Sequence, residues 1–194
     1  MTTKPVPFAD LERLPSLTTE RLMLRWIEER DAPELRRIFG DPEVMRYWSA
    51  PPLADDAAAL ALVREIQDLF RQRVLFQWGI AWRDAGTLLG SVTLWRWDGA
   101  HRRAEVGFAL GREFWGKGVM SEALQRLLDY AFEELGLHRI EADTDPRNHR
   151  SLAVLERHGF RREGYLRERF HVAGEIQDSV VLGLLRSEWK KGLG

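Results

Sequence analysis

Residues 104–136, AEVGFALGREFWGKGVMSEALQRLLDYAFEELG, decide how this chain of 194 residues folds. They read as an apolar strand, a Gly-Lys-Gly turn and an amphipathic helix that Gly136 is expected to end. Apolar residues recur along the helix at i, i+3 and i+4, so one stripe of it is buried. The stripe consists of Met120, Ala123, Leu124, Leu127, Leu128, Ala131, Phe132 and Leu135.

The glycine turn before the helix has two interpretations. Such a turn leaves backbone N–H groups unpaired at the positive end of the helix dipole, which suits a phosphate. Alternatively, the glycines only turn the corner between strand and helix, and the acidic Glu122 satisfies the dipole.

A nucleoside triphosphatase is excluded. Residues 111–117 fit the pattern G-x-x-x-x-G-K, but Gly118 replaces the Ser or Thr whose hydroxyl would hold magnesium. Glu113, Phe114 and Trp115 are also too bulky to wrap around a triphosphate.

Composition narrows the class of protein. The formal net charge of −1 gives no electrostatic argument for nucleic acid or an anionic membrane as a partner. No apolar run approaches the ~20 residues that span a bilayer, and the N-terminus lacks a secretory core. The absence of cysteine points to the cytoplasm. Histidines 101, 138, 149, 158 and 171 have no metal-ligand spacing, so no metal is expected.

The hydrophobic pattern predicts one alternating α/β unit, with residues 1–16 as a loose arm and residues 17–194 as a single domain. The expected strands are 22–27, 76–82, 88–97, 104–110, 140–144, 165–170 and 179–185. The expected helices run from a cap at Asp31 to Phe39, over 41–48, from a cap at Asp55 or Asp56 to Phe70, over 120–135 and over 148–158.

Four blocks of sequence carry a family resemblance. WGKGVMSEAL (115–124), followed after a strand by NHRSLAVLERHGF (148–160), resembles the acetyl-CoA-binding core of the GNAT superfamily of N-acetyltransferases. SLTTERLMLRWIEERDAPEL (16–35) and GEIQDSVVLGLLRSEW (174–189) resemble the Rim-type (RimJ/RimL-like) branch, which acetylates ribosomal-protein N-termini.

The resemblance implies an α/β (α+β) fold of GNAT type, with a central, mostly antiparallel, splayed sheet of six or seven strands flanked by helices. It implies acetyl-CoA as co-substrate, with the pantetheine along the strand and the pyrophosphate at the helix start. The implied cofactor-binding residues are Phe108, Ala109, Leu110, Trp115, Gly116, Lys117, Gly118, Val119, Met120, Ser121, Asn148 and Ser151. The chain departs from the commonest motif at Trp115, where Gln or Arg is frequent, and at Met120, where a small residue is usual.

Asn148 and Ser151 also have a simpler interpretation, because Asn148 is a good helix N-cap with Ser151 in the first turn. The resemblance implies that Asn148 bonds the pantetheine and that the Ser151 hydroxyl faces the thioester sulfur. Leu155 stands where many members carry a tyrosine general acid, so Ser151 is the implied acid.

Acetyl transfer requires a neutral amine, and an α-amino group titrates near ~7.7–8.0 whereas Lys titrates near ~10.4. Glu105 is the candidate base, acting through water in a ternary complex; the alternative is a surface carboxylate paired with Arg102 or Arg103. His149 and an unassisted amine are the competing hypotheses.

The expected acceptor is the α-amine of a ribosomal or other protein N-terminus. A small amine (a polyamine or an aminoglycoside-like compound) and a non-catalytic acyl-CoA-binding module are the alternatives. Trp48, Trp95 and Trp97 are candidates for lining the acceptor cleft, and the pairs 55–56 and 28–29 are the acidic clusters that a polyamine would favour. We expect a monomer or homodimer.

Overall fold

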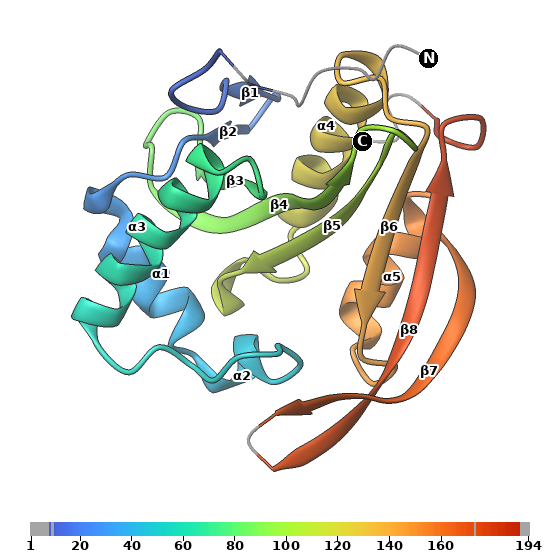
Figure 1. Cartoon of the computed structure of the whole chain (residues 1–194). Coiled ribbons are helices and arrows are strands. Elements are labelled where there is room, and N and C mark those ends of the chain that lie inside the picture. The colour runs from blue at the N-terminus through green and yellow to red at the C-terminus, as the bar shows by residue number, and fades with distance from the viewer. Residues whose placement is uncertain (1–7, 9, 173, 191–194) are drawn as a thin grey trace.

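An open sheet forms the middle of the molecule in the computed structural model of the chain, which describes residues 8, 10–172 and 174–190 (Figure 1). Within these residues the strand order is β1-β2-β3-β4-β5-β6-β8-β7. The strands are β1 (Leu17–Thr18), β2 (Leu22–Arg25), β3 (Leu75–Trp82), β4 (Leu88–Asp98), β5 (Arg103–Leu110), β6 (Arg139–Thr144), β7 (Arg161–Val172) and β8 (Glu175–Leu185). The helices are α1 (Ala32–Phe39), α2 (Pro42–Met45), α3 (Asp56–Arg71), α4 (Val119–Glu133) and α5 (His149–Arg157), with 3-10 turns at Glu29–Asp31 and Arg112–Phe114.

The sheet is split where β5 meets β6. These two strands are parallel and pair only from Arg103–Glu105 to Arg139–Glu141, whereas the other neighbouring pairs are antiparallel. Beyond Glu105 the two strands diverge (Figure 1). The prediction of a mostly antiparallel, splayed sheet flanked by helices is confirmed. The predicted count of six or seven strands is wrong, because β1 is too short to give a sequence pattern.

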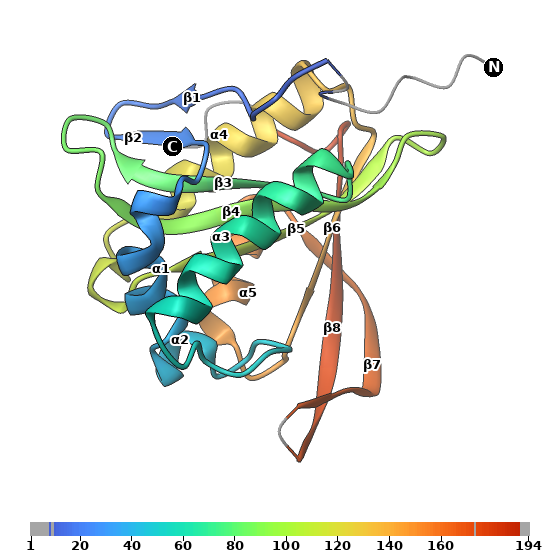
Figure 2. The same ribbon diagram turned by 60° about the vertical axis from the view of Figure 1, so that its left-hand side comes forward.

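Helices cover both faces of the sheet. α1 and α3 lie on one face and α4 on the other (Figure 2). The predicted apolar stripe of α4 is buried from Met120 to Phe132 in the core cluster that α4 shares with Trp78 of β3 and Leu155 of α5. Leu135, the last residue of the predicted stripe, lies past the end of α4 and is half-buried. Ile66 of α3 and Leu88 of β4 belong to a second cluster on the opposite face.

The predicted N-terminal arm lies partly outside the described residues, since residues 1–7 and 9 are not among them. Its described part is attached to the sheet. Leu14 is buried, and the Pro15 carbonyl accepts a hydrogen bond from Trp78 Nε1 at 2.9 Å. The ring of Phe8 meets that of Phe76 edge-on, with centroids 5.1 Å apart.

Asp55 and Asp41 cap helices as their residue types suggest, because their carboxylates accept from Ala58 N and Glu43 N at 2.8 Å. Asp31 is the N-cap residue of α1, as predicted, but its side chain makes no capping hydrogen bond. Its carboxylate instead forms a buried bidentate ion pair with Arg25, at 2.6 and 2.8 Å, and accepts from the Glu28 N–H. This pair ties β2 to the start of α1.

We expect Asp31→Asn to lower the free energy of unfolding by about 3–5 kcal/mol, because it leaves the buried Arg25 guanidinium without its counter-charge. Asp68→Asn is the matched control, since Asp68 pairs with Arg71 on the exposed face of α3 and such pairs contribute less than about 1 kcal/mol. Urea denaturation measures both. Equal losses in the two variants would contradict the role of the buried pair.

Candidate active site

The turn before α4 presents unpaired backbone donors. Gly116 and Gly118 have φ of +73° and +75°, a conformation that favours glycine. Gly118 precedes the helix, and no side chain in the described part of the chain caps it. The helical hydrogen bonds of α4 begin with the Glu122 N–H, which donates to the Gly118 carbonyl at 3.0 Å. The N–H groups of residues 119–121 are therefore available to an anion.

Glu122 fixes this turn to the connection between β1 and β2. Its carboxylate accepts from Thr19 Oγ1 at 2.5 Å, from Arg21 N at 3.0 Å and from Arg21 Nε at 2.6 Å. Arg21 Nη1 also donates to the Lys117 carbonyl at 3.3 Å. Burial disfavours the charged carboxylate, but the bonds from Thr19 and Arg21 outweigh it, and the pKa of Glu122 is lowered. The Glu122 carboxylate at the start of α4 is therefore occupied by its bonds to Thr19 and Arg21.

A cavity of about 400 Å³ opens beside the turn. It runs along β5 and past the first turns of α4 and α5. Of the predicted cofactor-binding residues, the cavity is lined by Phe108, Ala109, Leu110, Trp115, Gly116, Gly118, Val119, Met120, Ser121, Asn148 and Ser151. Lys117 is exposed and does not line it. Its wall also carries two cations that the sequence pattern did not indicate, Arg150 and Arg157, which lie two turns apart on α5.

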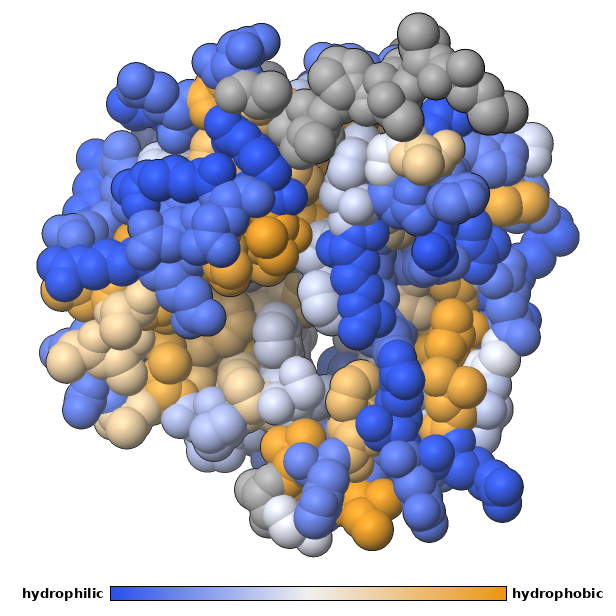
Figure 3. Space-filling view, in the orientation of Figure 1, coloured by the Kyte–Doolittle hydropathy of each residue, from blue (hydrophilic) through white to orange (hydrophobic). Residues whose placement is uncertain are grey.

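A second cavity, of about 420 Å³, occupies the space between the diverging strands β5 and β6. The surface is hollowed between the half that carries α1 to α3 and the half that carries β6 to β8 (Figure 3). The two cavities share the wall residues Tyr47, Trp48, Phe108, Asn148 and Ser151. The site is therefore two chambers that meet at the first turn of α5.

Asn148 caps α5, as its residue type suggests, because its Oδ1 accepts from Ser151 N at 3.1 Å. This bond uses only the carbonyl oxygen of the side chain. Among the described residues the amide nitrogen has no partner and remains a donor at the junction of the chambers. Capping and ligand binding are thus compatible in one side chain, and the ligand-binding role stays a prediction.

Glu105 faces the second cavity and is only 8% exposed. It pairs with Arg96 at 3.0 Å rather than with Arg102 or Arg103, so the alternative of a surface carboxylate is wrong. Arg96 has a left-handed φ of +50° in a β-bulge between Trp95 and Asp98. Burial raises the pKa of Glu105, Arg96 opposes the shift, and the neighbouring Asp143 adds to it.

The second cavity is acidic. Glu105 of β5, Asp143 and Asp145 at the end of β6, and Asp178 of β8 line it. Asp145 is neutralised by Arg147 at 2.6 Å, and Asp178 accepts from Tyr165 and from the Glu168 N–H. The acidic pairs at 55–56 and 28–29, singled out from the sequence, do not line it.

Two of the three candidate tryptophans, Trp48 and Trp95, line the second cavity. Trp97 does not, and its ring packs edge-on against Phe76 with centroids 6.2 Å apart. The bulge after Trp95 inserts a residue and turns Trp97 to the other face of the sheet. The competing base, His149, is exposed and lines neither cavity.

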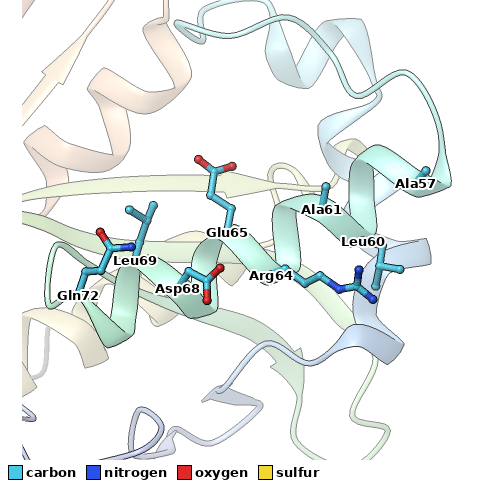
Figure 4. A pocket seen from close by; sticks show the side chains of 8 residues that line it. All are labelled: Ala57, Leu60, Ala61, Arg64, Glu65, Asp68, Leu69 and Gln72. Atoms are coloured by element: carbon cyan, nitrogen blue, oxygen red, sulfur yellow. The ribbon is translucent and has the colours of Figure 1, made fainter.

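Outside these two cavities, the described residues offer few other candidate binding sites. A shallow hollow along α3 is lined by side chains of that one helix and shares no residue with either cavity (Figure 4). The described residues contain no group of three or more His, Asp or Glu placed to hold a metal. None of the helices they form is long and apolar enough to cross a membrane.

Comparison with known proteins identifies relatives along almost the whole chain. Residues 21–161 match the family described as "Acetyltransferase (GNAT) domain". The chain is 37% identical to the "Uncharacterized N-acetyltransferase p20" of Bacillus licheniformis, covering 90% of this chain and 98% of the relative. It is 28% identical to the "[Ribosomal protein uS5]-alanine N-acetyltransferase" of Escherichia coli (91% and 93% covered) and 29% identical to the "Spermidine N(1)-acetyltransferase" of Vibrio cholerae (87% and 95%).

The fold is similar to that of solved acetyltransferases. The structure titled "Mycobacterium smegmatis RimJ in complex with CoA-disulfide" aligns with a TM-score of 0.82 and 25% sequence identity. The alignment covers 92% of this chain and 91% of that one. The fold predicted from the sequence is therefore confirmed.

We expect Gly118→Asp to weaken CoA binding by at least about tenfold, because it places a carboxylate where a phosphate would meet the helix start. Gly86→Asp is the matched control, since Gly86 also has a left-handed φ, of +70°, and lies in a turn that lines neither cavity. Calorimetric titration with CoA measures both. Unchanged affinity in a folded Gly118→Asp protein would dismiss the turn as a phosphate site.

Proposed function

Because the chain belongs to the GNAT family of acetyltransferases, we propose that it transfers the acetyl group of acetyl-CoA to the α-amine of a protein or peptide N-terminus. GNAT acetyltransferases use acetyl-CoA. Because the chain belongs to this family, it is an acyltransferase. The non-catalytic acyl-CoA-binding module is therefore set aside. The acceptor and the roles of individual residues are the proposal.

The observation that carries this proposal is the junction of the two chambers at Asn148 and Ser151. One chamber ends at the glycine turn and suits the pyrophosphate, while the open edge of β5 offers backbone groups to the amides of the pantetheine arm. The other chamber is acidic and suits an ammonium group. The acetyl group would be held where they meet.

The chemistry then divides between two side chains. Glu105, through a water molecule, accepts a proton from the amine as its nitrogen attacks the thioester carbonyl. The carbon–sulfur bond breaks and the Ser151 hydroxyl donates a proton to the departing thiolate, whose thiol-like pKa is about 8.5. Solvent water returns a proton to Ser151, and Glu105 releases to solvent the proton that it took from the amine. Burial of Glu105 supports its part, because a raised pKa makes this carboxylate a better base near neutral pH.

The charge in the acceptor chamber favours a single ammonium group. Asp145 and Asp178 are already bonded to protein donors. Glu105 is paired with Arg96, so Asp143 is the least compensated of the four carboxylates. Its hydrogen bond comes from the uncharged Ser179 hydroxyl, Arg169 approaches it only to 3.8 Å, and burial raises the pKa of Asp143. An α-amine also requires less help from a base than a lysine does, because its own pKa is lower. The relative that acts on alanine of ribosomal protein uS5 supports this acceptor class.

A polyamine is the second candidate acceptor. The four carboxylates in one chamber favour a cationic substrate in general, and one relative is a spermidine acetyltransferase. Its several ammonium groups would have to compete with Arg147 for Asp145.

The experiment that separates these acceptors is acetyl-CoA turnover across four substrates: peptides with a free N-terminal alanine or serine, the same peptides blocked at the α-amine but carrying lysine, spermidine, and an aminoglycoside. We expect the free peptides to give the highest kcat/KM. A kcat/KM for spermidine above that of every peptide would assign the chain to polyamines instead.

The pH dependence of kcat/KM tests Glu105. The carboxylate must be deprotonated to act, so activity rises with pH through its pKa. Arg96→Gln removes the cation that lowers this pKa, and we expect the acid limb of the profile to move to higher pH. Glu105→Gln should abolish that limb and leave only the deprotonation of the amine, near ~7.7–8.0. Identical profiles in all three proteins would refute Glu105 as the base.

Ser151→Ala should lower kcat about tenfold with little change in the KM for acetyl-CoA, because charge develops on sulfur only toward the transition state. Ser187→Ala, on an exposed turn, is the control and should behave as wild type. Steady-state kinetics with the best acceptor measures both. A wild-type kcat in Ser151→Ala would remove the serine from the mechanism.

A further inference from the structure

A buried histidine stands directly behind the proposed pyrophosphate site. His158 follows α5 and is only 2% exposed. Both ring nitrogens are bonded, Nε2 to Ser121 Oγ at 2.8 Å and Nδ1 to Gln125 Oε1 at 3.1 Å. The two partners lie one turn apart on α4, so the histidine spans from the core to the helix start.

The direction of these bonds follows from Gln125. Its Nε2 donates to Asp129 Oδ1 at 2.7 Å and to the Lys190 carbonyl at 3.3 Å, and both of these atoms are acceptors. The amide oxygen therefore faces the ring, and His158 Nδ1 carries a hydrogen in either protonation state. In the neutral ring Nε2 is bare and accepts the Ser121 hydroxyl hydrogen.

With a neutral His158 ring, this hydrogen bond disfavours an anion beside Ser121. Ser121 occupies the first turn of α4 and lines the cofactor cavity, beside the unpaired N–H groups. With its hydrogen given to the neutral ring, the Ser121 oxygen would present only lone pairs to a phosphate. If Nε2 gains a proton, it donates to Ser121 Oγ and the hydroxyl can turn and donate to the phosphate.

We propose that binding of CoA is coupled to the uptake of one proton by His158, through the hydroxyl of Ser121. His158 is thus a positioning residue that matches the helix start to its anionic ligand. The inference rests on the proposed cofactor site, and its experiment separates the two.

The surroundings of His158 set the sign of the effect. Burial lowers the pKa of the ring, and the positive charge of Arg157 lowers it further. On α4, Asp129 reaches the ring only through Gln125, and Glu122 is bonded to Arg21. The free protein therefore holds the ring neutral at pH 7. Since the protonated ring binds the anion better, affinity should be highest in acid and fall as pH rises toward the pKa of the ligand-bound ring.

Calorimetric titration with dephospho-CoA, in buffers of different ionisation heat between pH 5.0 and 7.5, counts the protons taken up. This probe keeps the pyrophosphate but lacks the 3′-phosphate, whose titration near pH ~6 would overlap, and its thiol titrates well above this range. We expect wild type to take up at least about half a proton at its maximum. His138→Gln, which changes an exposed histidine, should match wild type.

Two variants test the relay. His158→Gln offers Ser121 an amide donor that does not titrate, so its affinity should be independent of pH over this range with no proton uptake. Ser121→Ala should take up less than about half as much as wild type. Should His158→Gln fail to fold, Ser121→Ala and the nitrogen chemical shifts of His158 with and without dephospho-CoA provide the same measurement.

The outcomes are distinct. Binding by wild type without proton uptake, or with uptake unchanged in the two relay variants, would overturn the coupling and leave the cofactor site standing. A folded wild-type protein that binds neither dephospho-CoA nor CoA at any pH would overturn the proposed cofactor site itself.

Discussion

The structure depends on the divergence of two parallel strands. β5 and β6 share only the pairs from Arg103 to Glu105 and then separate, while β4 and β8 hold their outer edges. If β5 and β6 stayed paired along their whole length, their backbone hydrogen bonds would close the gap between them and no cavity could form there. The break leaves backbone groups that must find partners elsewhere, and it opens the wedge in which both cavities lie.

The two sides of this wedge differ in charge, although the same pair of strands borders both. Glu105 ends the paired section and is held there by Arg96, whereas Phe108 lies in the open section and belongs to both cavities. The glycine turn then brings the positive end of α4 to one side. Carboxylates of β6 and its neighbours collect on the other. A cofactor rich in phosphate and a cationic acceptor would thus approach one point from opposite directions.

The sequence predicted what depends on neighbouring residues. The glycine turn, the α4 stripe and the Asn148 cap are local patterns, and the structure has all three. It did not predict what depends on contacts between distant segments. The Arg96 pair requires a bulge that alternation cannot show, and the acidic chamber is assembled from β5, the end of β6 and β8. The contact of Ser121 with His158 joins residues 37 apart in the sequence.

The clamp between Glu122 and the connection of β1 to β2 has a consequence for cooperativity. Thr19 and Arg21 reach across roughly half of the chain to hold the start of α4. The phosphate turn and the first strands therefore order together, late in any folding route that begins with local contacts. A ligand seated on the turn would protect these strands from opening, and at a hundred times its dissociation constant it would add about 2.7 kcal/mol to their stability. The rate of amide hydrogen exchange in β1 and β2 should therefore show whether a ligand occupies the start of α4.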